Sequence, residues 1–197
     1  YGYESSSRIK QSMNKKYDLV YVGHNWWRWD IMKNVVLPNI LACKDKINTT
    51  CFIGHWWDKP PSWAKECDFE GPFKMDIKKF KELRIKTKAA VEYSKVIKAM
   101  SQGNINIMTQ RPLLRHFKHV TSKYFEIFLA DTIPLVVLDK EHSQEIYGSD
   151  GKNIIINEKT NRNKIREVLQ ESNRYKNIIK NIRYHLSKNH SYDIRLG

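Results

Sequence analysis

The chain has 197 residues, of which 41% are hydrophobic and 12% aromatic, and only 8 are Gly and 6 Pro. This length suits one domain with a sizeable core, and the composition excludes a fibrous or disordered chain. The net charge of +14 indicates an anionic partner, such as nucleotide phosphate, nucleic acid or an acidic surface, with an ordinary basic surface as the alternative.

In chain order the hydrophobic pattern first predicts a strand at 17–23, a helix at 30–42 that Pro38 kinks or restarts, a strand at 49–54 and an irregular segment at 55–75. A helix at 88–100, a strand at 105–108, a helix at 122–130 and a strand at 133–138 are predicted next. The chain is then predicted to form a short helix at 141–147, a strand at 154–156 and two final helices. This alternation predicts an α/β, Rossmann-like fold: an open, mainly parallel sheet with helices on both faces.

The last helix has an apolar stripe and a basic face that carries Lys176, Lys180 and Arg183. Such a face is more often a solvated surface than a binding site. Residues 1–16 are polar, so we expect a linker or the remnant of a preceding segment there, followed by one domain over residues 17–197.

The compartment is indicated by three observations. No apolar run approaches the roughly 20 residues of a membrane-spanning helix, and the N-terminus lacks the layout of a secretory signal. The cysteines, at positions 43, 51 and 67, are odd in number and fit no paired metal spacing. We therefore expect reduced thiols in a cytoplasmic protein.

Ligands of open α/β sheets bind beyond the carboxyl ends of the strands. Four segments lie there: residues 23–28, residues 54–58, residues 109–112, and the helix entry at Thr121 and Ser122. A helix start presents free N–H groups to phosphate oxygens, although N-capping by Thr121 or Ser122 explains these two residues equally well.

Glu126 is a single acid in an apolar helix, four residues after Ser122 and therefore on the same helical face. A buried carboxylate needs partners. Sugar hydroxyls would serve, and a structural ion pair with a nearby Lys or Arg is the alternative.

The cations best placed beside this face are Arg28, Arg111 and Lys123, each of which has surface charge as its ordinary explanation. The six tryptophans could stack on a base or a sugar, but packing against the sheet edge is the favoured interpretation for most of them. His24 and His55 follow strand ends in parallel fashion, yet without a carboxylate pair they make a weak metal site.

The segment VTSKYFEIFLADTIPLVV, preceded by INIMTQRP and followed by EIYGSDGKNIII and LSKNHSYDIR, resembles the carboxyl-terminal half of a GT-B glycosyltransferase. The resemblance is strongest to the spore-maturation-protein (CgeB-like) type among group 1 glycosyltransferases. It covers residues 17–195 broadly, and the specific part is 105–156.

The resemblance implies a donor-binding domain for a nucleoside-diphosphate sugar, without a metal or other cofactor. It implies that Glu126 binds the ribose and that Thr121, Ser122 and Lys123 lie near the diphosphate. The loop that contains Gly23, His24 and Arg28 would approach the diphosphate, and Arg111 would lie beside the base or the phosphates. An amino-terminal GT-B domain or a partner chain would supply acceptor contacts.

Two positions depart from the family pattern. Lys118 stands where many retaining members carry a second glutamate, which puts that sugar contact in doubt and leaves the catalytic residues unknown. Asp131 stands where the family usually has a turn glycine; aspartate can adopt the left-handed conformation at modest cost, so we expect the fold to survive this change. A basic nucleic-acid-binding module, a glycosyltransferase whose acceptor is nucleic acid, and a non-catalytic scaffold remain alternatives.

Overall fold

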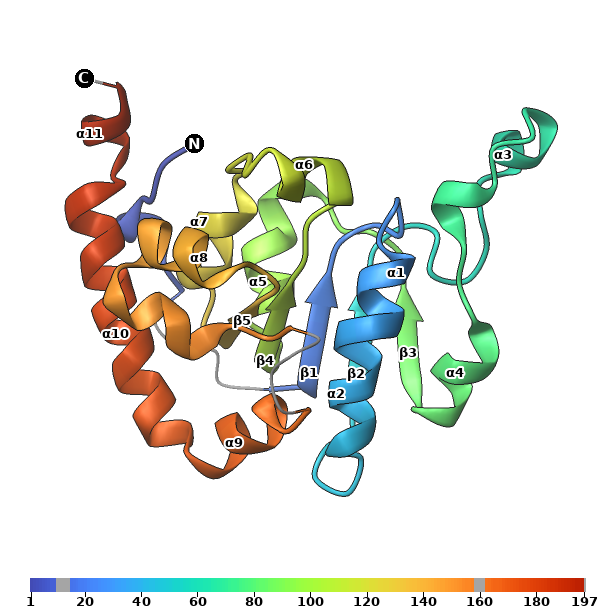
Figure 1. The fold of residues 1–197 in the computed structure, drawn as a ribbon, viewed down its shortest axis with the longest axis horizontal. Helices are drawn as coiled ribbons and strands as arrows, with labels where there is room; N and C mark the ends of the chain where they lie inside the picture. The colour runs from blue at the N-terminus through green and yellow to red at the C-terminus, as the bar shows by residue number, and fades with distance from the viewer. Residues whose placement is uncertain (10–14, 158–161, 197) are drawn as a thin grey trace.

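The computed structural model describes residues 1–9, 15–157 and 162–196 (Figure 1). They form a five-stranded sheet in the order β3-β2-β1-β4-β5, and each neighbouring pair of strands is parallel. The strands are β1 (Tyr17–Val22), β2 (Thr50–Ile53), β3 (Ile85–Lys88), β4 (Gly103–Met108) and β5 (Ile133–Val136). The predicted α/β, Rossmann-like fold is confirmed.

The strand order reverses its direction between β1 and β4. From β1 the chain moves outward through β2 to β3, then returns to place β4 on the other side of β1. Right-handed crossovers consequently put the helix after β1 on one face and the helices before β4 and β5 on the other. This reversal point is where open α/β sheets bind ligands.

The helical segment after β1 consists of α1 (Trp29–Ile31), a π-helical turn η2 (Met32–Val36) and α2 (Leu37–Ala42). Pro38 lies in the first turn of α2. Because proline has no N–H to donate, the preceding turn widens, and the predicted interruption at Pro38 is confirmed.

The predicted helix at 88–100 is confirmed over its second half and is wrong over its first. Lys88 ends β3, and the helical part consists of a 3-10 turn, η4 (Tyr93–Lys95), followed by α5 (Val96–Met100). β3 is an edge strand in which only Ile85 is buried, so its sequence lacks the apolar alternation that marks a strand. Tyr93, assigned to the apolar stripe, is 74% exposed.

A 3-10 turn, η1 (Ser5–Ser7), and four short helical segments between β2 and α7 (Lys123–Leu129) have no counterpart in the sequence prediction. The four segments are α3 (Ser62–Glu66), η3 (Gly71–Phe73), α4 (Ile77–Glu82) and α6 (Pro112–His116). Each has at most six residues, too few to establish a hydrophobic period.

The carboxyl-terminal part follows the predicted order except at 154–156 and at its end, where a third helix, α11 (Tyr192–Leu196), follows the two that were predicted. At 154–156 the chain forms the end of η5 (Ser149–Ile154) and a single bridge between Ile155 and Val136 rather than a strand. The helices of this part are α7 (Lys123–Leu129), α8 (Lys140–Tyr147), α9 (Lys164–Gln170), α10 (Ser172–Asn189) and α11 (Tyr192–Leu196).

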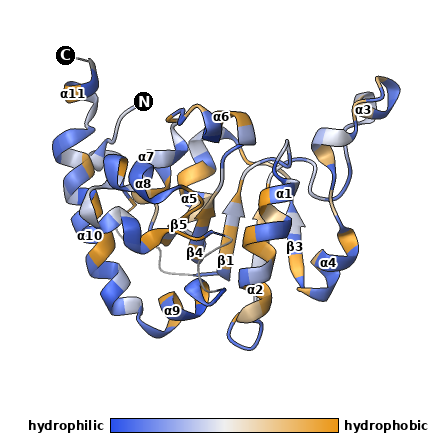
Figure 2. Cartoon of the chain, viewed as in Figure 1, coloured by the Kyte–Doolittle hydropathy of each residue, from blue (hydrophilic) through white to orange (hydrophobic). Residues whose placement is uncertain are grey.

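The core lies in the central strands and the helix faces that cover them. Figure 2 shows hydrophobic residues concentrated in the strands and alternating with hydrophilic residues along α10. Within the described residues, no helix is long and apolar enough to cross a membrane. Cys43 and Cys51 are buried, Cys67 is exposed, and all three are free thiols.

The amino-terminal segment packs onto the rest of the chain at two points. Tyr3 is 2% exposed and forms a parallel bridge with Ser191, and the Ile9 N–H donates to the Leu129 carbonyl at 2.9 Å. Residues 10–14 of the predicted linker lie outside the described residues. The domain boundary after residue 16 stays a prediction.

The fold accommodates Asp131 at the turn, and its backbone does not need the left-handed conformation there. The Asp131 N–H donates to Ser101 Oγ at 3.0 Å, and the Asp131 carboxylate forms an ion pair with Lys15 at 3.0 Å. These two contacts hold the turn in place of the conformational freedom of glycine.

Candidate functional site

The carboxyl ends of β1 and β4 are held together by side chains that lie just below the loops. The Tyr21 hydroxyl and Thr109 Oγ1 are hydrogen-bonded at 2.9 Å, and Trp57 Nε1 donates to the Gly23 carbonyl at 2.6 Å. A Cβ on Gly23 would lie 2.8 Å from Lys123 Nζ and 2.9 Å from the Tyr21 hydroxyl oxygen. The glycine therefore leaves the space into which the Lys123 amino group fits.

Lys123 begins α7 and turns its amino group toward the end of β1, where it donates to the Val22 carbonyl. Burial, and then the nearby Arg28, lower the pKa of Lys123 to about 7, while Glu126 opposes the shift. Near neutral pH this amine is therefore poised between its charged and neutral forms, and an added anion would favour the ammonium.

Two arginines lie near His24, and one of them, Arg28, also acts on Lys123. Arg28 is 8% exposed and donates to the His24 carbonyl at 2.7 Å, while the Arg111 guanidinium lies 4.8 Å from the centre of the Trp26 ring. Burial, and then Arg28, lower the pKa of Arg111. Within the described residues neither guanidinium forms an ion pair, and each has a buried Nε without a hydrogen-bond partner.

His24 is held in one tautomer by its neighbour. Its Nδ1 accepts the backbone N–H of His55 at 3.0 Å, and the two imidazole rings stack with centres 4.9 Å apart. Burial, followed by the surrounding cations, lowers the pKa of His24 to about 4. At neutral pH the ring is consequently uncharged, with its proton on Nε2, and can act there as a hydrogen-bond donor.

Glu126 lies on α7, one turn after Ser122, and is 7% exposed. Its Oε1 is buried and, among the described residues, has no hydrogen-bond partner. Hydrogen bonding to Glu126 raises the pKa of Tyr93, which also bonds Ser122, so these three side chains meet on one face. An unpaired buried acceptor costs about 1–3 kcal/mol, a cost that a donating hydroxyl would remove.

We call this group the carboxyl-edge cluster: Gly23, His24, Arg28, Arg111, Lys123 and Glu126. It contains six of the eight residues expected from the sequence. Ser122 occupies the N-cap position of α7 but its side chain makes no capping bond, and Thr121 contributes a carbonyl that accepts the Tyr124 N–H at 3.1 Å.

Sequence reasoning missed the support beneath the cluster and its neighbour Tyr93. Tyr21, Thr109 and Trp57 are strand or loop residues whose polar atoms meet only in three dimensions. Tyr93 fitted a helical stripe, and no sequence signal separated it from the core residues of that stripe. Lys118 is exposed, with φ of 50°, and lies outside the cluster.

The tryptophans divide between packing and exposure. Trp57 is 1% exposed and packs against Tyr21 and Phe52, whereas Trp27 and Trp63 are 49% and 41% exposed.

In the described part of the chain, no group of three or more His, Cys, Asp or Glu is arranged to hold a metal ion. The metal-independent expectation stays a prediction.

No protein family and no curated protein sequence matches this chain. Solved structures of T4 phage β-glucosyltransferase do match it. A point mutant with UDP-glucose superposes with a TM-score of 0.62 at 14% identity, covering 92% of this chain and 46% of that one. The UDP-glucose complex gives 0.60 at 14%, covering 92% and 47%, and the complex with UDP and Mn²⁺ gives 0.55 at 13%, covering 92% and 46%.

An additional structure of this neighbour, described as a DNA-modifying enzyme, superposes with a TM-score of 0.55 at 13% identity, covering 92% of this chain and 49% of that one. The chain thus spans about half the length of the structures that it matches. At this identity the likeness establishes the fold, which is a Rossmann-like unit of the kind found in a GT-B glycosyltransferase.

Proposed function

We propose that the chain is the nucleotide-sugar-binding half of a GT-B glycosyltransferase. The observation that carries this proposal is the carboxyl-edge cluster, where three cations that form no ion pair among the described residues lie near a buried oxygen of Glu126 that has no hydrogen-bond partner there. Positive charge alone would suit any anion. The neighbouring acceptor favours a ligand that has hydroxyl donors as well as phosphates, and a nucleoside diphosphate has both.

Each residue of the cluster has a role in this proposal. Arg28, Arg111 and Lys123 bind the diphosphate, with the guanidinium groups suited to paired contacts with phosphate oxygens. Glu126 Oε1 accepts a hydrogen bond from a ribose hydroxyl, and neutral His24 donates from Nε2. Gly23 has no side chain, and this leaves space for the Lys123 amino group beside the phosphates.

The chemical contribution of the cluster is to bind and stabilise the leaving group. As the bond between the sugar and the diphosphate breaks, negative charge grows on the diphosphate oxygens. Cations already fixed by the fold stabilise that charge without having to reorganise. The acceptor contacts and the catalytic base would come from an amino-terminal GT-B domain or from a partner chain.

Several finer assignments belong to the same proposal. The pattern of residues 105–156 supports a spore-maturation-protein-like type, and the free thiols agree with a cytoplasmic location. A nucleic-acid acceptor is supported by the net charge of +14 and by the DNA-modifying function of a structural neighbour. A binding module for nucleic acid without transferase activity is the second candidate, and the same charge supports it.

Calorimetric titration with UDP, UDP-glucose, GDP and ADP, each with and without Mn²⁺, tests the proposal. We expect saturable one-site binding for one nucleotide base in preference to the others, in the absence of the metal. Failure of all four nucleotides to bind would exclude the donor-binding function. Binding that requires Mn²⁺ would retain that function and exclude the metal-independent form of it.

A further inference from the structure

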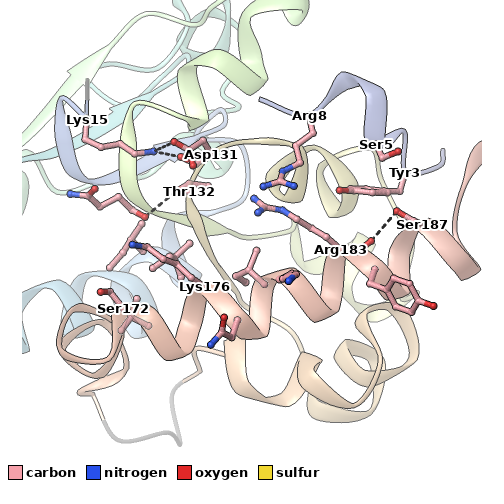
Figure 3. Close-up of a pocket in the computed structure, with 18 of the residues that line it drawn as sticks. Tyr3, Ser5, Arg8, Lys15, Asp131, Thr132, Ser172, Lys176, Arg183 and Ser187 are labelled. Atoms are coloured by element: carbon pink, nitrogen blue, oxygen red, sulfur yellow. Dashed lines mark hydrogen bonds and ion pairs between the residues drawn. The ribbon is translucent and has the colours of Figure 1, made fainter. Parts of the chain in front are cut away.

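A second cationic region lies at the opposite end of the sheet. A cavity of about 1240 Å³ opens at the amino ends of β4 and β5, between the amino-terminal segment and α10 (Figure 3). Asn104, Thr132 and Ile133 line its floor, whereas the carboxyl-edge cluster lies beyond the other ends of β1 and β4. We call it the basic cavity.

One wall of the basic cavity is a single polar stripe of α10. This stripe consists of Ser172, Lys176, Lys180, Arg183 and Ser187. It is the basic face that the sequence assigned to solvent, opposite the buried apolar face of the helix. At 1.5 Å of rise per residue, the row from Lys176 to Arg183 extends for about 10 Å.

Arg183 is fixed at the inner end of this row. Its Nε donates to the Phe128 carbonyl and its Nη2 to the Ala130 carbonyl, both at 2.8 Å. Burial, and then the charge of Arg8, lower the pKa of Arg183 to about 10. The guanidinium is therefore held rigidly in a position that solvent stabilises poorly.

Arg8 faces Arg183 from the opposite wall (Figure 3). Its Nε is buried and has no hydrogen-bond partner among the described residues. Tyr3 lies beside both guanidinium groups, and their charges partly offset the effect of burial, which raises the pKa of its hydroxyl. Two like charges that face each other in this way are stabilised by an anion between them.

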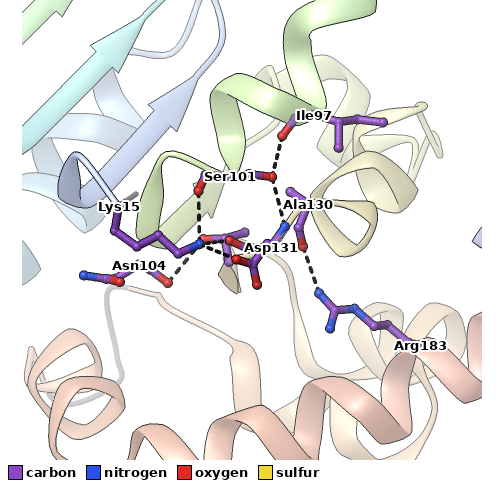
Figure 4. A network of polar contacts seen from close by, with 8 residues as sticks. Lys15, Ile97, Ser101, Asn104, Ala130, Asp131 and Arg183 are labelled. Carbon is purple, nitrogen blue, oxygen red and sulfur yellow. Dashed lines mark hydrogen bonds and ion pairs between the residues drawn. The ribbon is translucent and has the colours of Figure 1, made fainter. Parts of the chain in front are cut away.

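The lining supplies little negative charge of its own. Five cationic residues line the cavity, and Asp131 is the acidic residue among those that line it. Asp131 is already bound to Lys15, which also donates to the Ser101 carbonyl at 3.0 Å (Figure 4). The basic cavity is therefore complementary to an anion with several charges.

We propose that the basic cavity binds phosphate groups arranged along a nucleic-acid strand. One strand of a duplex carries a phosphate for every ~3.4 Å of axis, so a row of about 10 Å matches about three phosphates. A free phosphate would occupy only the end between Arg8 and Arg183. This inference does not rest on the proposed donor site, because no residue is shared between the two regions.

The test is the binding of a fluorescein-labelled twelve-base-pair DNA duplex, followed by anisotropy over a series of salt concentrations. The variant is Lys176→Gln/Lys180→Gln, which changes two exposed side chains. The control is Lys78→Gln/Lys81→Gln, which removes the same charge from exposed positions on α4 at the other edge of the sheet.

Loss of two phosphate contacts should reduce the slope of log affinity against log salt by ~1.8, and this corresponds to roughly 60-fold weaker binding at 0.1 M salt. The control should stay close to wild type. Equal losses in both variants, or no loss in the cavity variant, would overturn the proposal.

Two further arms separate the sources of phosphate and the two regions. Pyrophosphate is the probe for free phosphate. If it binds wild type and the cavity variant equally and also displaces the oligonucleotide, the site binds free phosphate, and the proposal of a nucleic-acid strand is contradicted. UDP titration of the cavity variant should match wild type. The donor site and the basic cavity can thus fail independently.

Discussion

The two cationic regions of this fold use charge in different ways. In the carboxyl-edge cluster the cations form no ion pairs among the described residues, a buried acceptor, Glu126, lies near Lys123, and burial lowers the pKa values of Lys123 and Arg111. In the basic cavity the lysines of α10 are exposed, and only Arg183 is strongly desolvated. Enclosure suits recognition of one small ligand, whereas an exposed row suits salt-dependent binding of a repeating polyanion.

The largest expected effect comes from breaking the support of the cluster. A Cβ on Gly54 would lie 2.1 Å from the Gly23 carbonyl oxygen, a backbone atom that cannot move aside. We expect Gly54→Ala to lower the free energy of unfolding by ~3 kcal/mol and the melting temperature by roughly 6–12 °C.

Gly71→Ala is the matched control for thermal unfolding, because no atom lies within 4 Å of its added Cβ. An equal melting temperature for Gly54→Ala and Gly71→Ala would mean that the loops after β1 and β2 are not packed as described. The oligonucleotide affinity of the folded Gly54→Ala protein should remain, since the basic cavity lies at the other end of the sheet.

Replacement of Arg111 tests the phosphate contact of the cluster with less risk to folding, because its side chain packs over Trp26 and forms no ion pair in the described residues. Loss of a charged hydrogen bond worth about 1.5–3 kcal/mol should weaken UDP binding about 10- to 100-fold in Arg111→Gln. Arg115→Gln, at the other end of α6, controls for charge. Equal UDP affinity in the two variants would remove Arg111 from the site.

A smaller effect is the uptake of a proton by Lys123 when UDP binds. The pKa of Lys123 is about 7 in the folded chain and 10.5 by default, so between these values the unfolded state binds more protons and this group adds stability as the pH rises. A bound diphosphate favours the ammonium. UDP binding at pH 8 should therefore take up close to one proton, and its affinity should fall by up to tenfold per pH unit above 7.

Calorimetry in two buffers of different ionisation enthalpy measures this proton uptake, and Lys123→Met should abolish it. UDP binding without proton uptake at pH 8 would show that the amine does not contact the phosphates. Oligonucleotide binding to the basic cavity should show no such uptake near pH 8, because the pKa of its desolvated Arg183 is about 10.

The sequence was informative where the signal is local. Buried strands that end in glycine located β1 and β2, and an acid in an apolar helix identified Glu126 and its cationic neighbours. β3 was missed because an edge strand with three exposed residues lacks an apolar pattern. Tyr93 was assigned to the buried stripe because its spacing is helical, but spacing alone does not show whether another element covers that part of the helix.

The basic cavity could not be predicted from the sequence for a different reason. Arg8 and Arg183 come from opposite ends of the chain, and only the packing of the amino-terminal segment against α10 brings them together. The basic face of α10 was visible in the sequence, but a solvated helix and a cavity wall have the same pattern.

The central claim is that Glu126 accepts a hydrogen bond from the ribose of a nucleoside diphosphate. The direct measurement compares UDP with 2′,3′-dideoxy-UDP on the wild type, on Glu126→Met and on the exposed control Glu82→Met. We expect wild type and control to bind the dideoxy ligand about 10- to 100-fold more weakly than UDP, and Glu126→Met to bind both ligands equally. If Glu126→Met discriminates between the two ligands as strongly as wild type does, Glu126 does not bind the ribose.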